Sequence, residues 1–121
     1  MSKILIIEDE STLSNALHEA LINGDEIEIE ADGSKAFQRV KEYKPDLILL
    51  DLFLPGKPGE VILEEIRSDA ETKNIPVLVA TVKADKEARE ICQKLGISGY
   101  FIKAHHTLKE IATEAKKILH K

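Results

Sequence analysis

Five short runs rich in apolar residues, separated by longer segments with helical spacing, constrain the fold of this chain more than any other feature. The runs Lys3–Ile7 and Asp46–Asp51 are almost continuously apolar, which is typical of central strands buried on both faces. The run Glu26–Ala31 alternates isoleucine with glutamate and predicts an edge strand with one solvated face. Val77–Thr81 and Gly99–Lys103 complete the set. Strands that alternate with helices predict an α/β fold in which helices cover a parallel sheet.

Turn and capping residues mark the helices between these runs. The segment from about Asp85 to Leu95 predicts a helix that ends at Gly96, and Thr107 with Glu110 has the spacing of a capping box for the last helix. Because crossover connections are right-handed, we expect a doubly wound, flavodoxin-like fold with five helices and five parallel strands in the order 2-1-3-4-5.

The single cysteine of the chain, Cys92, cannot form an internal disulfide. It shares one face of the predicted helix with Ala88, Ile91 and Leu95. We interpret Cys92 as a core side chain.

Length and charge narrow the classes of function. The 121 residues predict one domain over residues 1–121, and the last predicted helix finishes with the sequence, which favours a stand-alone domain. The net charge of −5 argues against direct binding of nucleic acid. No leader-like start or membrane-length apolar run is found, so we expect a cytoplasmic protein with no membrane partner.

Polar residues stand at the carboxyl ends of the predicted strands. Glu8 and Asp9 follow the first strand, Asp51 ends the third, Thr81 the fourth and Lys103 the fifth. Ligands of open parallel sheets bind beyond these strand ends, at the point where the strand order reverses. We therefore expect three carboxylates, one hydroxyl and one ammonium to meet in one site.

Such a cluster favours a divalent cation. Two like charges about 4 Å apart repel by roughly 4 kcal/mol at an effective dielectric constant of about 20. Carboxylate oxygens with room for water suit Mg²⁺, which usually also binds phosphate oxygens. Asp51 can then act as a nucleophile toward phosphorus and form an acyl phosphate, while Lys103 and Thr81 stabilise the transferred group.

With these residues the whole chain resembles the receiver domain of two-component response regulators, and in particular the chemotaxis receiver. The resemblance rests on the following residues: Glu8-Asp9, Asp51-Leu52-Phe53-Leu54-Pro55, Gly59, Thr81, Tyr100 and Lys103. It implies that Asp51 is the phosphoacceptor. It also implies that Asp9, Asp51 and the backbone carbonyl of Phe53 hold Mg²⁺, and that Glu8 holds it through water.

The resemblance further implies a phosphorylation-activated signalling switch. Thr81 and Lys103 would contact the phosphoryl oxygens, and Thr81 and Tyr100 would change position on phosphorylation. The fourth helix, fifth strand and fifth helix would form the output surface and a possible dimer interface. A sensor histidine kinase or histidine phosphotransfer protein would donate the phosphoryl group, and a downstream protein would read the output. The chain would catalyse only its own phosphorylation and dephosphorylation.

Two residues depart from the pattern of the family. Ala104 follows Lys103 where receivers commonly have proline, so we expect a trans peptide bond there. Val82 follows Thr81 where a small residue is usual, and its bulk could restrict the path of Tyr100. Both departures concern the switch rather than the phosphoryl chemistry.

Other interpretations are a receiver-like interaction module without phosphorylation and a flavodoxin-like binder of nucleotide or flavin. A phosphate site needs a turn rich in glycine or hydroxyl side chains after the first strand, whereas this chain has Glu8-Asp9-Glu10 there. The pair His105-His106 has no spaced metal-ligating partner, and we interpret it as a solvated loop.

Overall fold

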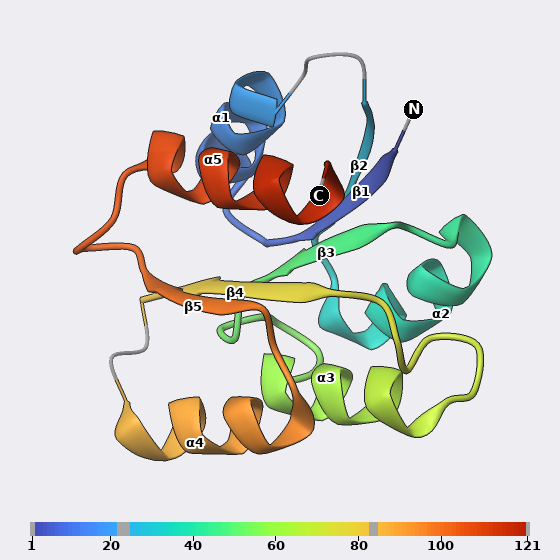
Figure 1. Ribbon diagram of the computed structural model, residues 1–121. Coiled ribbons are helices and arrows are strands. Elements are labelled where there is room, and N and C mark those ends of the chain that lie inside the picture. The colour runs from blue at the N-terminus through green and yellow to red at the C-terminus, as the bar shows by residue number, and fades with distance from the viewer. Residues whose placement is uncertain (1, 22–24, 83–84, 121) are drawn as a thin grey trace.

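A parallel β-sheet covered by helices on both faces forms the fold (Figure 1). The computed structural model describes residues 2–21, 25–82 and 85–120. The strands are β1 (Lys3–Ile7), β2 (Glu26–Glu30), β3 (Leu47–Leu50), β4 (Val77–Thr81) and β5 (Gly99–Ile102). The helices are α1 (Ser11–Leu21), α2 (Gly33–Tyr43), α3 (Gly59–Ser68), α4 (Lys86–Leu95) and α5 (Leu108–Leu119). The strand order is β2-β1-β3-β4-β5, so the predicted topology is confirmed and β2 is an edge strand.

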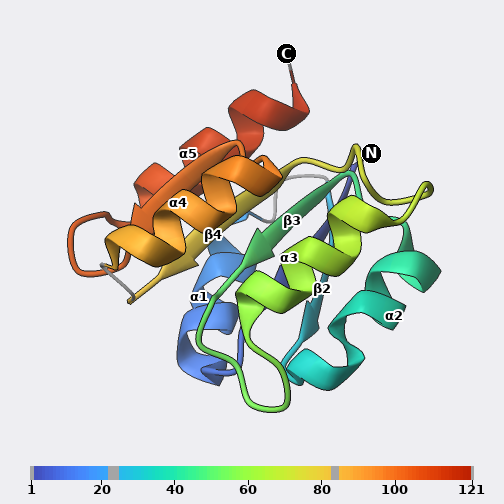
Figure 2. The same cartoon turned by 90° about the horizontal axis from the view of Figure 1, so that it is seen from below.

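The alternation of side chains along the strands divides the interior into two cores. Residues of one parity, including Ile4 and Ile6, face α1 and α5, whereas Leu5 and Ile7 face the other three helices. Figure 2 shows α2, α3 and α4 together on that second face. All residues of β3 and β4 are buried, which explains why their sequences are continuously apolar.

The predicted helix ends are confirmed where capping residues are strong. Asp32 and Asp85 each accept a hydrogen bond from the backbone two residues later, and Thr107 forms a complete capping box with Glu110. Gly96 has a φ of +100° at the end of α4, a conformation that favours glycine. Within the residues described, no helix combines the length and apolar character that crossing a bilayer requires.

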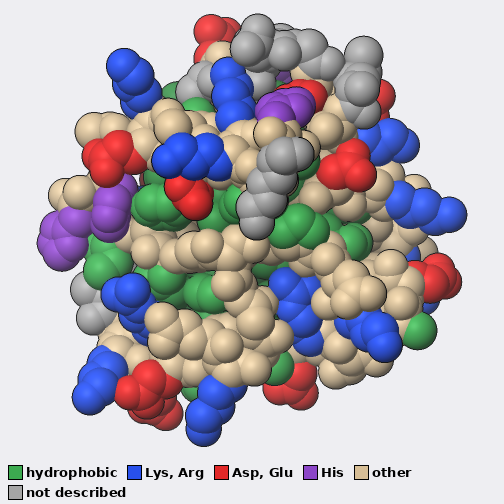
Figure 3. Space-filling model, in the orientation of Figure 1, with side chains coloured by type: hydrophobic (Ala, Val, Ile, Leu, Met, Phe, Trp, Pro, Cys, Tyr) green, Lys and Arg blue, Asp and Glu red, His purple; other side chains and the backbone are tan. Residues whose placement is uncertain are grey.

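The core position predicted for Cys92 is confirmed, but the apolar face predicted around it is buried only in part. Cys92 and Ala88 are buried as expected, but Ile91 is 41% exposed. Helix α4 lies beside α3 at the β5 end of the sheet (Figure 2), so its buried stripe is narrower than that of a helix with neighbours on both sides. In Figure 3, hydrophobic side chains form a broken band between α5 and the strands below it, whereas charged side chains are prominent over α4.

The side chain of Arg67 in α3 ties together two connections of the fold. Its Nε and Nη2 donate to the Gly96 carbonyl at 3.0 and 2.9 Å. Its Nη1 donates to the carbonyls of Lys73 at 3.0 Å and Ile75 at 2.8 Å. Burial lowers the pKa of Arg67. The guanidinium therefore joins the α3–β4 connection to the C-terminal end of α4.

Replacing Arg67 with methionine should lower the free energy of unfolding by about 2 kcal/mol, because partly buried carbonyls lose their donors while the aliphatic stem is kept. Urea denaturation measures the change. Lys94→Met is the matched control, since Lys94 is an exposed cation in the last turn of α4. Equal losses in the two variants would contradict the role given to Arg67.

Candidate metal centre at the carboxyl edge of the sheet

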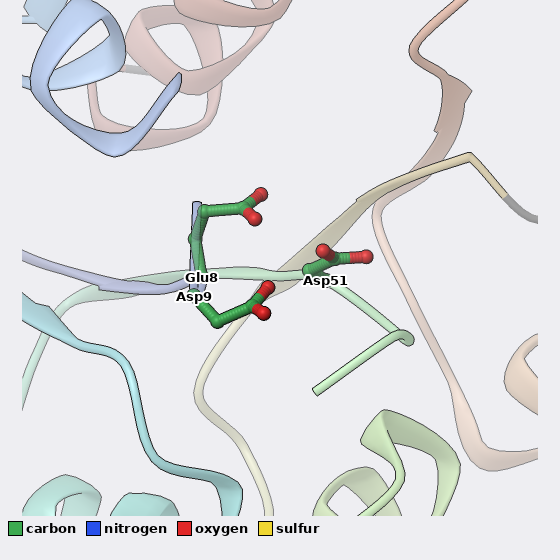
Figure 4. A group of neighbouring side chains, drawn as sticks. All are labelled: Glu8, Asp9 and Asp51. Atoms are coloured by element: carbon green, nitrogen blue, oxygen red, sulfur yellow. The ribbon is translucent and has the colours of Figure 1, made fainter. Parts of the chain in front are cut away.

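The predicted acidic cluster is present at the ends of β1 and β3. One carboxylate oxygen from each of Glu8, Asp9 and Asp51 lies within 4.8 Å of the others. Figure 4 shows Glu8 and Asp9 together at the end of one strand, with Asp51 beside them at the end of the neighbouring strand. The register places Ile7 opposite Leu50, and Asp51 N donates to the Ile7 carbonyl at 3.0 Å. The sheet itself therefore brings the carboxylates together.

Two of these carboxylates are buried, which makes their proximity unfavourable without a cation. Glu8 is 3% exposed and Asp51 is 5% exposed, whereas Asp9 is exposed. Lys103, directly after β5, places its Nζ 2.5 Å from Glu8 Oε1 and 3.2 Å from Asp51 Oδ2. The ammonium of Lys103 thus forms ion pairs with both buried carboxylates, and the exposed carboxylate of Asp9 adds a third negative charge beside them.

The pKa values of the cluster reflect this balance. Burial and the charge of Asp51 raise the pKa of Glu8 to about 7, against the opposing effect of its hydrogen bond with Lys103. Burial alone would lower the pKa of Lys103, but the hydrogen bond to Glu8 and the charges of both carboxylates raise it above its usual value. Lys103 is therefore an ammonium at neutral pH.

The donor set fits a hard divalent cation. All three side chains offer carboxylate oxygens, and the exposed position of Asp9 leaves the cluster open to solvent. Phe53 lies next to the cluster, because its backbone N–H donates to Asp51 Oδ1 at 3.1 Å. Phe53 itself is 51% exposed. The described residues thus provide a site that could bind a metal ion.

Thr81 and Tyr100, the two predicted switch residues, lie on adjacent strands. Thr81 is buried at the end of β4, and its carbonyl accepts from Lys103 N at 2.9 Å. Tyr100 is half-buried in β5, with the Arg89 guanidinium 5.4 Å from the centre of its ring. Val82 is exposed, and its predicted effect on Tyr100 stays a prediction.

The loop after Lys103 corrects one prediction. The peptide bond to Ala104 is trans as expected. His106, however, lies in the loop but is only partly exposed: its ring centre is 5.1 Å from that of Phe101 in an edge-on arrangement, and Nδ1–H donates to the Ile102 carbonyl at 3.2 Å. His105 is exposed as predicted. The two histidines differ because the turn after β5 folds His106, but not His105, back onto residues four and five positions earlier in the chain.

Known proteins share this fold and sequence pattern. The family model of the response regulator receiver domain matches residues 4–115. Chemotaxis protein CheY-3 of Vibrio cholerae is 33% identical over 112 residues, which cover 89% of this chain and 86% of that protein. The chain spans only 6% to 52% of the length of three other curated relatives.

Solved structures agree with the sequence matches. The phosphorylated cyanobacterial phytochrome response regulator RcpA is 34% identical with a TM-score of 0.79, and the match covers 97% of this chain and 90% of that one. The Mn²⁺-bound form of response regulator Rcp1 is 31% identical with a TM-score of 0.83, covering 98% of this chain and 91% of that one.

The raised pKa of Glu8 predicts a pH-dependent stability in the absence of divalent cations. Between pH 4.5 and about 7 the folded protein keeps a proton on Glu8 that the unfolded chain has lost, so stability falls as the pH rises. Relative to Glu8→Gln, the parent should lose about 3 kcal/mol of unfolding free energy over this window, at about 1.4 kcal/mol per pKa unit.

Urea denaturation in the presence of a chelator, repeated from pH 4.5 to 8, measures this difference. Glu64→Gln, which changes an exposed glutamate of α3, serves as the control for removing one carboxylate. A constant difference between the parent and Glu8→Gln would contradict the raised pKa.

Proposed function

The chain belongs to the receiver-domain family of response regulators, and from this premise we propose that Asp51 accepts a phosphoryl group in a Mg²⁺-dependent reaction. The observation that carries the proposal is the buried Asp51 carboxylate, which lies beside two further carboxylates and 3.2 Å from the Lys103 ammonium. This arrangement combines a nucleophile, a set of metal-binding oxygens and a cation.

The donor in this proposal is a phosphohistidine of a sensor histidine kinase or a histidine phosphotransfer protein. A carboxylate oxygen of Asp51 attacks phosphorus, the P–N bond of the donor breaks, and the departing imidazole keeps the electron pair and takes up a proton. Later attack by water releases inorganic phosphate and restores Asp51. The chain catalyses only these reactions of its own side chain.

The residues around Asp51 have distinct parts in this transfer. Lys103 is held within reach by its contact with Glu8, so its ammonium can stay with the oxygens of Asp51 and of the incoming phosphoryl group. Asp9, Asp51 and the backbone carbonyl of Phe53 would hold Mg²⁺, and Glu8 would hold it through water. Bound there, Mg²⁺ supplies neutralisation of the carboxylate and phosphoryl charges.

The output in this proposal is the surface of α4, β5 and α5. Thr81 connects it to Asp51, because the hydroxyl at the end of β4 would contact the phosphoryl oxygens, and Tyr100 is on the next strand. The hydrophobic band of Figure 3 suits contact with a downstream protein or a second copy of the chain. Names of relatives such as hybrid signal transduction histidine kinase D and sensor histidine kinase TmoS support a place in kinase signalling.

Treatment with acetyl phosphate should add one phosphoryl group in the presence of Mg²⁺ and none in its absence. Intact-mass measurement detects the product, and Asp51→Asn should abolish it because the nucleophilic carboxylate is lost. Asp46→Asn is the matched control, since Asp46 lies before β3 at the opposite end of the same strand and should be labelled like the parent. Full labelling of the Asp51 variant would refute the assignment.

Mg²⁺ should raise the thermal midpoint of the unphosphorylated protein, because an ion that binds only the folded state stabilises it. At ten times the dissociation constant the gain is about 1.4 kcal/mol, or several degrees for a chain of this size. Asp9→Asn should weaken this response, whereas Asp46→Asn should keep it. A midpoint that does not change with Mg²⁺ would count against a metal site in the resting protein.

A further inference from the structure

The loop between β3 and α3, residues 51–58, is docked onto the first turn of α2. Figure 2 shows the tip of this loop beside the beginning of α2. Gly33 N, at the start of α2, donates to the Pro55 carbonyl at 2.9 Å. Asp32 keeps this turn in place, because its Oδ1 accepts from Ser34 N at 2.9 Å and from Ser34 Oγ at 2.7 Å.

The contact is too close for any side chain at Gly33. A Cβ atom there would lie 2.5 Å from the Lys57 carbonyl oxygen and 2.9 Å from that of Pro55. Both atoms belong to the backbone, so the loop as a whole would have to move away. From the loop side, Gly56 has a φ of +87°, and its Cβ would lie 2.7 Å from Asp32 Oδ1. Two glycines thus allow direct contact between two backbones.

The remainder of the loop is attached to the phosphoacceptor itself. Phe53 N donates to Asp51 Oδ1 at 3.1 Å. At the start of α3, Gly59 packs so closely that a Cβ would lie 2.6 Å from the Asp51 carbonyl oxygen. Phe53 therefore lies between two fixed points of the loop. One is its own hydrogen bond to Asp51, and the other is the hydrogen bond between Gly33 and Pro55.

We propose that Gly33 is a positioning residue for the metal site. By holding Pro55 and Lys57, the backbone at Gly33 fixes the path of the loop and with it the carbonyl of Phe53. Gly33 touches neither Asp51 nor the ion and acts only through the loop. The inference rests on the proposed function, because it takes the Phe53 carbonyl to be a metal ligand.

A purely structural role would make a different prediction. If the contact only stabilised the fold, Gly33→Ala would lower the free energy of unfolding, but the molecules that remain folded would bind the ion with the affinity of the parent. If the contact positions a ligand, affinity falls in the folded molecules too. Disturbing residues that support metal ligands typically weakens metal affinity by about tenfold to a hundredfold.

Mn²⁺ binding provides the test, with free Mn²⁺ measured by electron paramagnetic resonance. The dissociation constant of Gly33→Ala should be about tenfold or more above that of the parent. Gly99→Ala is the matched control: its new Cβ would meet only side-chain atoms, Leu78 Cδ2 at 3.0 Å and the Phe101 ring at 3.5 Å, and its affinity should not change. Parent affinity in folded Gly33→Ala, or equal weakening in both variants, would overturn the proposal.

A second measurement uses the unmodified protein, so it does not depend on the folding of a variant. Because coupling is reciprocal, an ion on the Phe53 carbonyl should stabilise the docked loop and slow exchange of the Gly33 amide hydrogen. The Lys44 amide, which donates to the Val40 carbonyl at 3.0 Å at the other end of α2, is the reference for slowing that is not specific to the Gly33 contact. We expect Mg²⁺ to slow Gly33 about tenfold more than Lys44, matching the loss of affinity.

Equal slowing of the two amides would overturn the positioning role. The proposed function is judged separately by the parent protein. If the parent bound no Mn²⁺ and still became phosphorylated on Asp51, the metal assignment and this inference would both be wrong, while Asp51 would remain the acceptor. If the parent bound Mn²⁺ and folded Gly33→Ala bound it with the same affinity, only the positioning role of Gly33 would be refuted.

Discussion

The contact of one ammonium with two buried carboxylates is the interaction on which the candidate site depends. Lys103 is 95 positions from Glu8 and 52 from Asp51, so the contact forms only when β1, β3 and β5 have all taken their places in the sheet. Without Lys103, two negative charges would stand together with almost no access to water, which proteins tolerate poorly. The same contact leaves the cluster with excess negative charge, which gives a divalent cation a physical reason to bind.

The sheet supplies the rigidity that this site needs. Strands β3 and β4 are buried along their whole length, and each is paired on both sides. Their ends therefore hold Asp51 and Thr81 at fixed positions, with side-chain directions set by the strand alternation. Helices contribute mainly by covering the two faces, and α2 additionally meets the loop after Asp51 with its first turn.

Much of this architecture could be predicted from the sequence, because its signals are local. Continuous apolar runs identified the central strands, the alternation of Ile27 and Ile29 with glutamates identified the edge, and the polar residues after the runs identified the site. Features that depend on contacts between distant segments could not be predicted. Ile91 is exposed because α4 has few neighbours, and Gly33 meets a loop that begins 18 positions further along the chain.

The hydrogen bonds of Arg67 have a mechanical consequence for α4. They fix the C-terminal end of that helix at Gly96, whereas Asp85, at the other end, accepts a hydrogen bond from the first turn of the helix itself. If α4 tilts, the helix therefore rotates about its C-terminal end. The helix has 10 residues and is about 15 Å long, so a rotation of about 10° moves its N-terminal end by about 2.6 Å. A small rotation about the C-terminal end thus produces its largest displacement at the N-terminal end of α4, the end that follows Thr81 in the chain.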